Sequence, residues 1–118
     1  MLLIEDSEDD ALLIQRALRR LDREVRCTRV ETPSDLKAAL ANGEWDLAIS
    51  DFRMPALNGL AALEIVRSVS ARLPFIILSA TIDEATARRA LDGGANACLT
   101  KYDLSRLAPA VRELIGPA

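Results

Sequence analysis

The sequence predicts a single α/β domain in which a five-stranded parallel sheet is covered by helices on both faces. Three observations support this. Five short apolar segments alternate strictly with five amphipathic segments, most of the apolar segments are continuous, and no linker or repeat interrupts the pattern. Strands that alternate with helices form parallel sheets, and continuous apolar strands are typical of sheets buried on both faces. The 118 residues are a usual length for one domain, which we expect to cover residues 1–118.

The N-terminal part contains the first strand, the first helix and the second strand. Leu2–Ile4 is a short apolar run typical of a buried strand. Ser7 is a good cap for a helix N-terminus, and the two aspartates that follow favour one. Apolar residues at helical spacing continue this helix to about residue 21. Val25–Val30 alternates apolar and polar side chains, as a half-exposed strand does.

The second helix, the third strand and the third helix follow in the middle of the chain. Thr32–Asp35 begins a helix, since proline fits the first turn, and Asn42–Gly43 ends it. Leu47–Ser50 is the next apolar strand, and Asp51–Asn58 forms the loop after it. A helix then runs to about Arg72, just before a proline.

The last third of the chain repeats the alternation. Phe75–Leu78 is the most hydrophobic strand, and the helix that begins near residue 83 ends at Gly93–Gly94, a pair expected to form a left-handed cap. Ala97–Thr100 is the fifth strand. The last helix has its apolar stripe within residues 107–115. We expect Pro109 in its first turn, because proline deeper in a helix removes a hydrogen bond and clashes.

The composition excludes several classes of function. Fifteen basic and eighteen acidic side chains leave a net charge of −3, which does not suit a protein that binds nucleic acid. The absence of histidine excludes imidazole-based zinc sites and the serine and cysteine triads. The apolar runs are far shorter than the roughly 18 residues that span a membrane. No signal peptide is visible, and we expect a cytoplasmic protein.

Polar side chains follow four of the predicted strands at one edge of the sheet. Glu5 and Asp6 follow the first strand, Asp51 the third, Ser79 the fourth and Lys101 the fifth. Ligands of open α/β sheets bind beyond the carboxyl ends of the strands. Three carboxylates and one ammonium leave an excess of negative charge, which favours a bound cation. Mg²⁺ is the natural candidate, because it takes oxygen ligands and leaves positions for phosphate oxygens.

A purely structural reading of these residues is the alternative. The acidic run of residues 5–10 would then be a solvated helix start, and we adopt this reading for Glu8 and Asp10. Gly59 and the proline before it are expected to shape the loop rather than do chemistry. Arg88 and Arg89 are expected to be solvated helix charges.

Four segments give the chain a resemblance to the receiver domain of two-component response regulators. They are Leu2–Ser7, Asp51–Pro55 with Gly59 following, Ile76–Ala80 and Ala97–Lys101. Their order and separations are those usual in the family, and the resemblance covers essentially the whole chain. It implies the strand order 2-1-3-4-5, the flavodoxin-like arrangement.

The resemblance implies a role for each candidate residue. Asp51 would accept a phosphoryl group and form an aspartyl phosphate. Lys101 would neutralise charge on Asp51 or on the phosphoryl oxygens, and the Ser79 hydroxyl would bind a phosphoryl oxygen. The implied Mg²⁺ ligands are Asp6, Asp51, the backbone carbonyl of Arg53, and Glu5 through a water molecule.

The resemblance implies a conformational switch in signal transduction rather than an enzyme. The phosphoryl donor would be a phosphohistidine on a sensor kinase or a phosphotransfer protein, and a homodimer through the last helices is compatible with the family. Two alternatives stay open. One is a receiver-like module that binds proteins without being phosphorylated. The other is an aspartate-nucleophile phosphohydrolase of the haloacid-dehalogenase kind, which needs an aspartate where Arg53 stands.

Three positions depart from the family pattern. Tyr102 follows Lys101 where the family usually has proline, and we expect a trans bond there, since a cis bond before a non-proline residue costs about 3–4 kcal/mol. Cys98 occupies a position that is often aromatic, and Arg53 places a long cation beside the acceptor. Both cysteines are expected to be small buried residues. Cys27 and Cys98 would lie on opposite edge strands, roughly 19 Å apart, too far for a disulfide.

Overall fold

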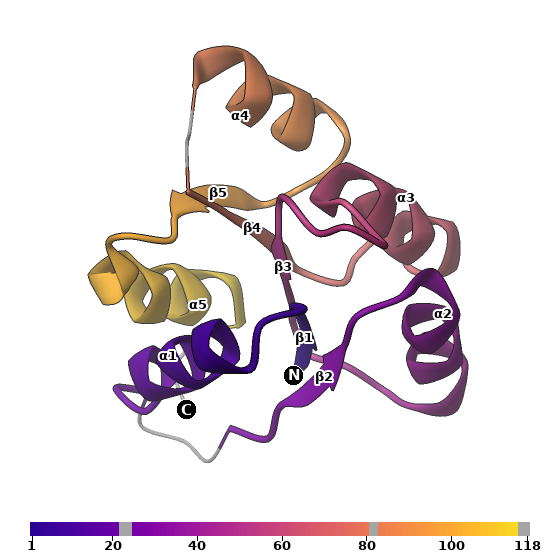
Figure 1. Cartoon of the computed structure of the whole chain (residues 1–118), viewed down its shortest axis with the longest axis horizontal. Coiled ribbons are helices and arrows are strands. Elements are labelled where there is room, and N and C mark those ends of the chain that lie inside the picture. The colour runs from indigo at the N-terminus through magenta and orange to yellow at the C-terminus, as the bar shows by residue number, and fades with distance from the viewer. Residues whose placement is uncertain (22–24, 81–82, 116–118) are drawn as a thin grey trace.

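The chain folds into one parallel sheet with helices on both faces (Figure 1). The computed structural model describes residues 1–21, 25–80 and 83–115. The strand order is β2-β1-β3-β4-β5, which confirms the predicted fold class and topology. The strands are β1 (Leu2–Ile4), β2 (Thr28–Val30), β3 (Ala48–Asp51), β4 (Phe75–Ser79) and β5 (Ala97–Thr100). The helices are α1 (Glu8–Leu18), α2 (Pro33–Asn42), α3 (Gly59–Val69), α4 (Glu84–Asp92) and α5 (Leu107–Ile115), with a 3₁₀ turn at Leu104–Arg106.

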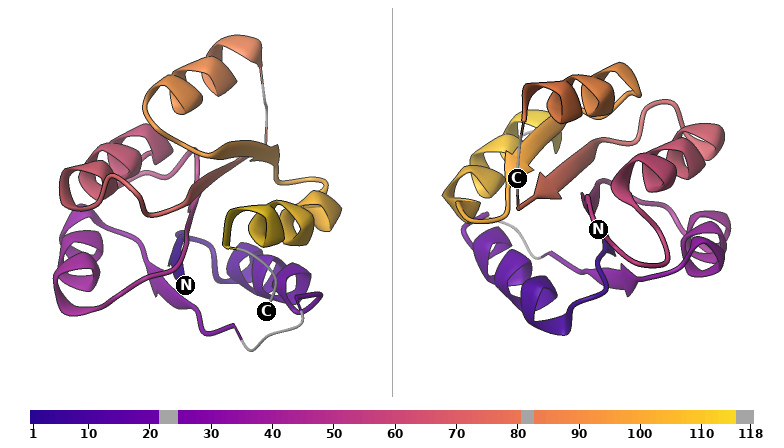
Figure 2. Two further views of the ribbon diagram at one scale, coloured as in Figure 1. Left: turned by 180° about the vertical axis from the view of Figure 1, so that it is seen from behind. Right: turned by 45° about the horizontal axis from the view of Figure 1, so that its top comes forward.

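The sheet separates two apolar cores. On one face, α2, α3 and α4 bury residues that include Leu36, Leu63 and Ala90. On the other face, α1 and α5 lie side by side and bury Ile14 and Val111 (Figure 2). The residues of β1, β3 and β4 are all buried. Each fully buried Leu, Ile or Phe side chain contributes about 1.5–3 kcal/mol, so the centre of the sheet is a firm base for the loops at its carboxyl edge.

Polar side chains begin the helices where the sequence predicts. The Ser7 hydroxyl accepts a hydrogen bond from the Asp10 N–H at 3.2 Å and caps α1. Thr32 accepts from the Asp35 N–H at 3.1 Å and caps α2, with proline at the first position. Pro109 is the third residue of α5, in the first turn as predicted, where its missing N–H removes no intrahelical bond.

The predicted ends of the first helix and the second strand are wrong by a few residues. The helix ends at Leu18 because the next three N–H groups turn to carbonyls three residues back. This tighter turn still buries Leu21, which explains the longer apolar pattern. The strand covers only Thr28–Val30, because β1 offers three residues for pairing.

Other predicted boundaries also need correction. The third helix ends at Val69 rather than near Arg72, because Ser70 has an extended backbone with φ −143° and ψ 119°. The third strand is shifted by one residue, to Ala48–Asp51, and the fourth extends to Ser79, so Asp51 and Ser79 belong to the sheet ladder. At the end of α4 only Gly94 is left-handed, with φ 104°; Gly93 keeps helical angles.

Several expectations about the backbone and the thiols are tested as well. No cis peptide bond occurs in the described ranges, so the bond between Lys101 and Tyr102 is trans, as expected. Cys27 and Cys98 are free and stand at opposite edges of the sheet, which confirms the absence of a disulfide. Both are half-buried, whereas full burial was expected. Within the part of the chain that the structure covers, no helix has the length and apolar character needed to cross a membrane.

Candidate functional site

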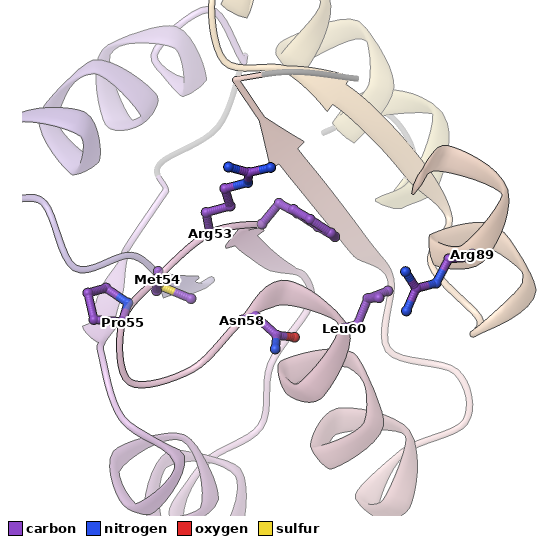
Figure 3. A pocket seen from close by; sticks show the side chains of 7 residues that line it. Arg53, Met54, Pro55, Asn58, Leu60 and Arg89 are labelled. Atoms are coloured by element: carbon purple, nitrogen blue, oxygen red, sulfur yellow. The ribbon is translucent and has the colours of Figure 1, made fainter. Parts of the chain in front are cut away.

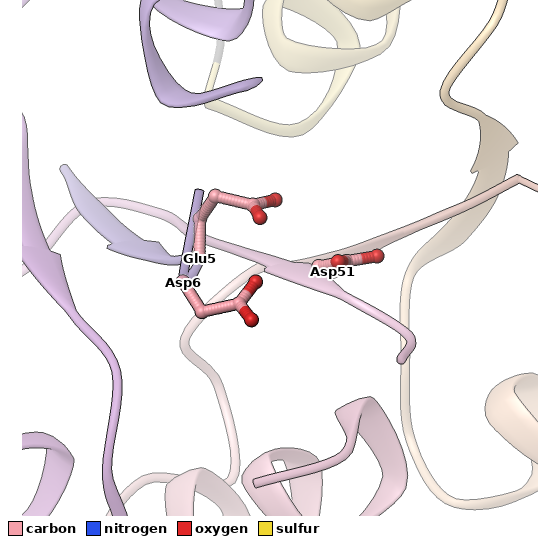
Figure 4. A group of neighbouring side chains, drawn as sticks. All are labelled: Glu5, Asp6 and Asp51. Atoms are coloured by element: carbon pink, nitrogen blue, oxygen red, sulfur yellow. The ribbon is translucent and has the colours of Figure 1, made fainter. Parts of the chain in front are cut away.

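The carboxyl edge of the sheet brings together three acidic side chains from two neighbouring strands. Glu5 and Asp6 follow β1, and Asp51 is the last residue of β3. One carboxylate oxygen from each residue lies within 4.8 Å of the others. Figure 4 shows Glu5 and Asp6 projecting from the end of β1 toward the side where Asp51 lies. Glu5 and Asp51 are buried and Asp6 is exposed, so this carboxylate cluster has one side open to solvent.

The ammonium group of Lys101 joins the cluster from the end of β5. Its Nζ lies 3.0 Å from Asp51 Oδ2, 3.2 Å from Glu5 Oε2 and 2.7 Å from Asp10 Oδ2. Burial opposes the charge on Lys101, but hydrogen bonds to Asp10 and Asp51 and the nearby negative charges outweigh burial and raise the pKa above its ordinary value. Lys101 is therefore a permanent cation in this site.

Within this cluster, the surroundings of Glu5 disfavour its charged form. Its side chain is 0% exposed, and its Oε1 accepts a hydrogen bond from the Ser7 N–H at 3.1 Å. Its Oε2 lies at ion-pair distance from Lys101 but has no hydrogen-bond partner among the described residues. Burial, together with the negative charge of Asp51, raises the pKa of Glu5 to about 7 against the opposing effects of Ser7 and Lys101. A buried carboxylate with one oxygen that lacks a hydrogen bond is stabilised by a further cation nearby.

The donor set of this cluster fits a hard divalent cation. Its side-chain donors are all carboxylate oxygens, which Mg²⁺ prefers, and Mg²⁺ usually combines one or two carboxylates with water. The unsatisfied Oε2 of Glu5 points to a missing partner inside the protein, and the exposed Asp6 leaves space for water. Glu5, Asp6 and Asp51 are thus suited to hold Mg²⁺.

Ser79 stands at the end of β4, next to the strand that carries Asp51. Its side chain is buried, and its carbonyl oxygen accepts a hydrogen bond from the Lys101 N–H at 3.0 Å. Asp51 itself pairs with Leu78 in the ladder. The ends of β3, β4 and β5 are thereby connected, and the sheet sets the positions of Asp51, Ser79 and Lys101 relative to one another.

Gly59 allows α3 to begin against the strand end that carries Asp51. Its N–H donates to the Phe52 carbonyl at 2.9 Å, and a Cβ at this position would lie 3.0 Å from Asp51 O and from Phe52 Cα. The Asn58 side chain caps α3 by accepting from the Ala61 N–H at 2.8 Å. Gly59 therefore has the loop-shaping role that the sequence predicts, since only glycine leaves room for this close approach.

A hollow of about 530 Å³ lies beside the loop that follows Asp51 (Figure 3). Arg53 stands on the loop, and Arg89 reaches toward the hollow from α4. The residues that line it are Phe52, Arg53, Met54, Pro55, Asn58, Leu60 and Arg89. None of these residues is acidic, so this hollow adjoins the carboxylate cluster but offers no carboxylate ligand of its own. Arg88 and Arg89 are exposed, as expected.

Asp10 contacts Lys101 of the site, a contact that was not predicted from the sequence. The prediction of a solvated charge is correct for Glu8, whose side chain is 83% exposed, but wrong for Asp10, which contacts Lys101 at 2.7 Å. One signal was present in the sequence. Asp10 lies four residues before Ile14, so helical periodicity places it on the buried stripe of α1 rather than on the solvent face.

Comparison with known proteins identifies a family and several relatives. The family model of the response regulator receiver domain matches residues 1–112. The sensory/regulatory protein RpfC of Xanthomonas campestris is 31% identical over 130 aligned positions, which cover 100% of this chain and 18% of RpfC. The probable chemotaxis protein CheY of Rhizobium etli is 29% identical, over 98% of this chain and 92% of CheY. The chain thus corresponds to a small part of RpfC but to nearly all of CheY.

A solved structure with the same fold also carries a metal ion. The receiver domain of the sensor histidine kinase PA1611 from Pseudomonas aeruginosa matches with a TM-score of 0.81 and 27% sequence identity, over 98% of this chain and 95% of that domain. That structure has a magnesium ion coordinated in its active-site cleft.

Proposed function

The chain belongs to the response regulator receiver family, and from that premise we propose that Asp51 accepts a phosphoryl group in a Mg²⁺-dependent reaction. The observation that carries this proposal is the contact of Lys101 with Asp51 at 3.0 Å, inside a cluster that also holds Glu5 and Asp6. Phosphoryl transfer depends mainly on positioning and on stabilisation of charge. A carboxylate nucleophile beside a permanent cation and further oxygen donors meets both needs.

The Mg²⁺ of this proposal would be held by side chains and one backbone group. The ligands are Asp6 and Asp51 directly, the backbone carbonyl of Arg53, and Glu5 through water. When bound, Mg²⁺ supplies positive charge that offsets the charge on the phosphoryl oxygens. The proximity of the three carboxylates and the unsatisfied Oε2 of Glu5 support the carboxylate members of this ligand set.

The residues of this chain position the reacting groups. A carboxylate oxygen of Asp51 forms a bond to phosphorus while the bond from phosphorus to a histidine nitrogen of the donor breaks, and the imidazole leaves with the electron pair. Lys101 remains protonated and donates to Asp51 and to a phosphoryl oxygen. The Ser79 hydroxyl donates to a second phosphoryl oxygen. Because these 118 residues contain no histidine, the donor histidine lies outside them, on a sensor kinase or a phosphotransfer protein.

The proposed output is a change of conformation rather than turnover of a substrate. The phosphoryl oxygens would draw Ser79 inward and move the loop after β4, which changes the outer faces of the last helices. The extent of the change is limited by the difference in contacts between the two states. We assign residues 1–118 to one receiver domain that acts in the cytoplasm, with a homodimer through the last helices as its candidate assembly.

Incubation with Mg²⁺ and a small acyl or amido phosphate, followed by intact-protein mass measurement, tests the proposal. We expect a mass gain of one phosphoryl group that disappears in Asp51→Asn and after removal of Mg²⁺ by a chelator. Asp46→Asn is the control, since Asp46 is an exposed aspartate that precedes β3. No adduct with any donor would refute the proposal and favour a protein-interaction module. Multiple-turnover release of phosphate would instead favour a phosphohydrolase.

A further inference from the structure

Lys101 has a carboxylate partner that the proposed reaction does not use. Asp10 Oδ2 lies 2.7 Å from Lys101 Nζ, closer than Asp51 at 3.0 Å and Glu5 at 3.2 Å. The Asp10 side chain comes from the first turn of α1 and is separated from Lys101 by 91 residues of sequence. Such a contact, between the start of a helix and the end of β5, depends on the fold and not on local sequence.

The three carboxylates differ in how much they lose when Lys101 moves away. The Asp10 side chain is 41% exposed, whereas that of Asp51 is 9% exposed and that of Glu5 is fully buried. Water replaces the lost partner of an exposed carboxylate, so an exposed ion pair is weak. A buried carboxylate left alone keeps its full desolvation penalty. The contact with Asp10 is therefore the first that Lys101 gives up.

The ammonium group of Lys101 can donate only a small number of hydrogen bonds. An ammonium has three N–H donors. Three carboxylate oxygens, from Asp10, Asp51 and Glu5, lie within 3.2 Å of Lys101 Nζ. A phosphoryl oxygen on Asp51 would have to displace one of them to reach the ammonium. The donor now directed at Asp10 is the easiest to release, for the reason of exposure.

We propose that Asp10 is a releasable counter-ion that holds Lys101 in the unphosphorylated protein and slows phosphorylation of Asp51, an inference that rests on the proposed function. Asp10 is a positioning residue, because it acts through Lys101 and does not contact the phosphoryl group. A small hollow of about 30 Å³ beside this pair, lined by Asp10, Lys101, Leu13, Ile14 and Leu104, has room for a water molecule that can solvate Asp10 when the pair separates.

The initial rate of phosphorylation by acetyl phosphate with Mg²⁺, followed by intact mass, tests this inference. Asp10→Ala leaves Lys101 with a free donor, so we expect a rate about two- to fivefold higher, the size of effect typical of a partly exposed ion pair. Asp9→Ala is the matched control, because it removes the same charge from the next position of α1, where the side chain is exposed. We expect its rate to change by less than twofold. Asp10→Glu restores a carboxylate and should return the rate toward that of the unsubstituted protein.

Combination with Lys101→Met separates a direct contact from a general effect of charge. In that background Asp10→Ala should have no further effect, since coupled residues are non-additive. In the metal-free protein, the ammonium protons of Lys101 should exchange with water faster in Asp10→Ala than in Asp9→Ala, as judged by NMR. Thermal unfolding verifies that each variant is folded.

The possible results are distinguishable. If the unsubstituted protein takes no phosphoryl group, the proposed function and this inference both fail. If it is phosphorylated but Asp10→Ala is unchanged or slower, or Asp9→Ala accelerates equally, or acceleration by Asp10→Ala persists in Lys101→Met, this inference alone is refuted.

Discussion

At the carboxyl ends of the strands and at their amino ends, a basic side chain contacts groups from several elements. The groups that the two side chains contact differ in kind. At the carboxyl edge, Lys101 contacts three carboxylates. At the amino edge, Arg67 of α3 donates to the backbone carbonyl oxygens of Ser70, Leu73 and Gly94 at 3.1, 2.7 and 2.7 Å. Both cations join segments that are distant in the sequence. Only the first one sits in an excess of negative charge.

The difference distinguishes an edge where Arg67 holds backbone segments together from an edge that could hold a metal ion. All three guanidinium nitrogens of Arg67 donate to these carbonyls, and Asn96 completes the set by accepting from Arg67 and from the Phe75 N–H. The carboxyl edge instead keeps a buried oxygen of Glu5 without a hydrogen bond. A bound cation would stabilise the buried Glu5 oxygen that lacks a hydrogen bond, whereas the carbonyls around Arg67 already have a charged donor.

The largest expected effect is a loss of stability when the Arg67 side chain is removed. Arg67→Ala should lower the free energy of unfolding by about 2–4 kcal/mol, because it removes charged donors from several carbonyls at once. Urea denaturation measures the loss. Arg72→Ala, at an exposed arginine nearby, is the control and should change stability by less than about 0.5 kcal/mol. Equal losses in the two variants would show that Arg67 does not hold these segments together.

The second prediction concerns the carboxyl edge, where Glu5 Oε2 has no hydrogen bond. Here a substitution is expected to raise the free energy of unfolding. The pKa of Glu5 is raised to about 7 in the folded protein, so its contribution to stability is present below its unfolded pKa of 4.5 and is lost as the pH rises through about 7. Glu5→Gln should therefore stabilise the metal-free protein by about 1–2 kcal/mol near pH 8, with little difference near pH 5.

Denaturation at several pH values without Mg²⁺ measures this effect, with the exposed Glu44→Gln as control. Added Mg²⁺ should stabilise the unsubstituted protein more than Glu5→Gln, since the variant lacks one negative charge of the cluster. A variant that is less stable than the unsubstituted protein at pH 8 would contradict the view that burial disfavours the charged form of Glu5.

The smallest effect on stability is expected at Gly59, where the loop after Asp51 enters α3. Gly59→Ala should lower stability by about 1 kcal/mol, because the backbone at Asp51 and Phe52 must shift by a few tenths of an ångström. Phosphorylation, measured by mass, should slow several-fold, since the shift displaces the acceptor. Gly43→Ala contacts only the Trp45 side chain and should leave the rate unchanged. An unaltered rate in Gly59→Ala would mean that this loop does not set the position of Asp51.

The parallel sheet and the gathering of Glu5, Asp6, Asp51 and Lys101 could be predicted from the sequence for a general reason, whereas the strand order came from the resemblance to the receiver family. In a parallel sheet, residues that follow different strands reach the same edge. This rule does not reach Asp10, because Asp10 lies in the first turn of a helix and not at a strand end; its one signal is the helical spacing to Ile14. Arg67 gave no signal at all, since its main partners are backbone carbonyls, which every residue type provides.

Asp51 is the last residue of β3 and is paired with Leu78, in the most buried part of the sheet. As the proposed phosphoacceptor, Asp51 is held in place by the sheet ladder. Under that proposal, a donor protein has to bring its phosphorylated histidine to this position. Differences in reactivity among donors should then reflect how far each donor's side chain extends and how well it is aimed.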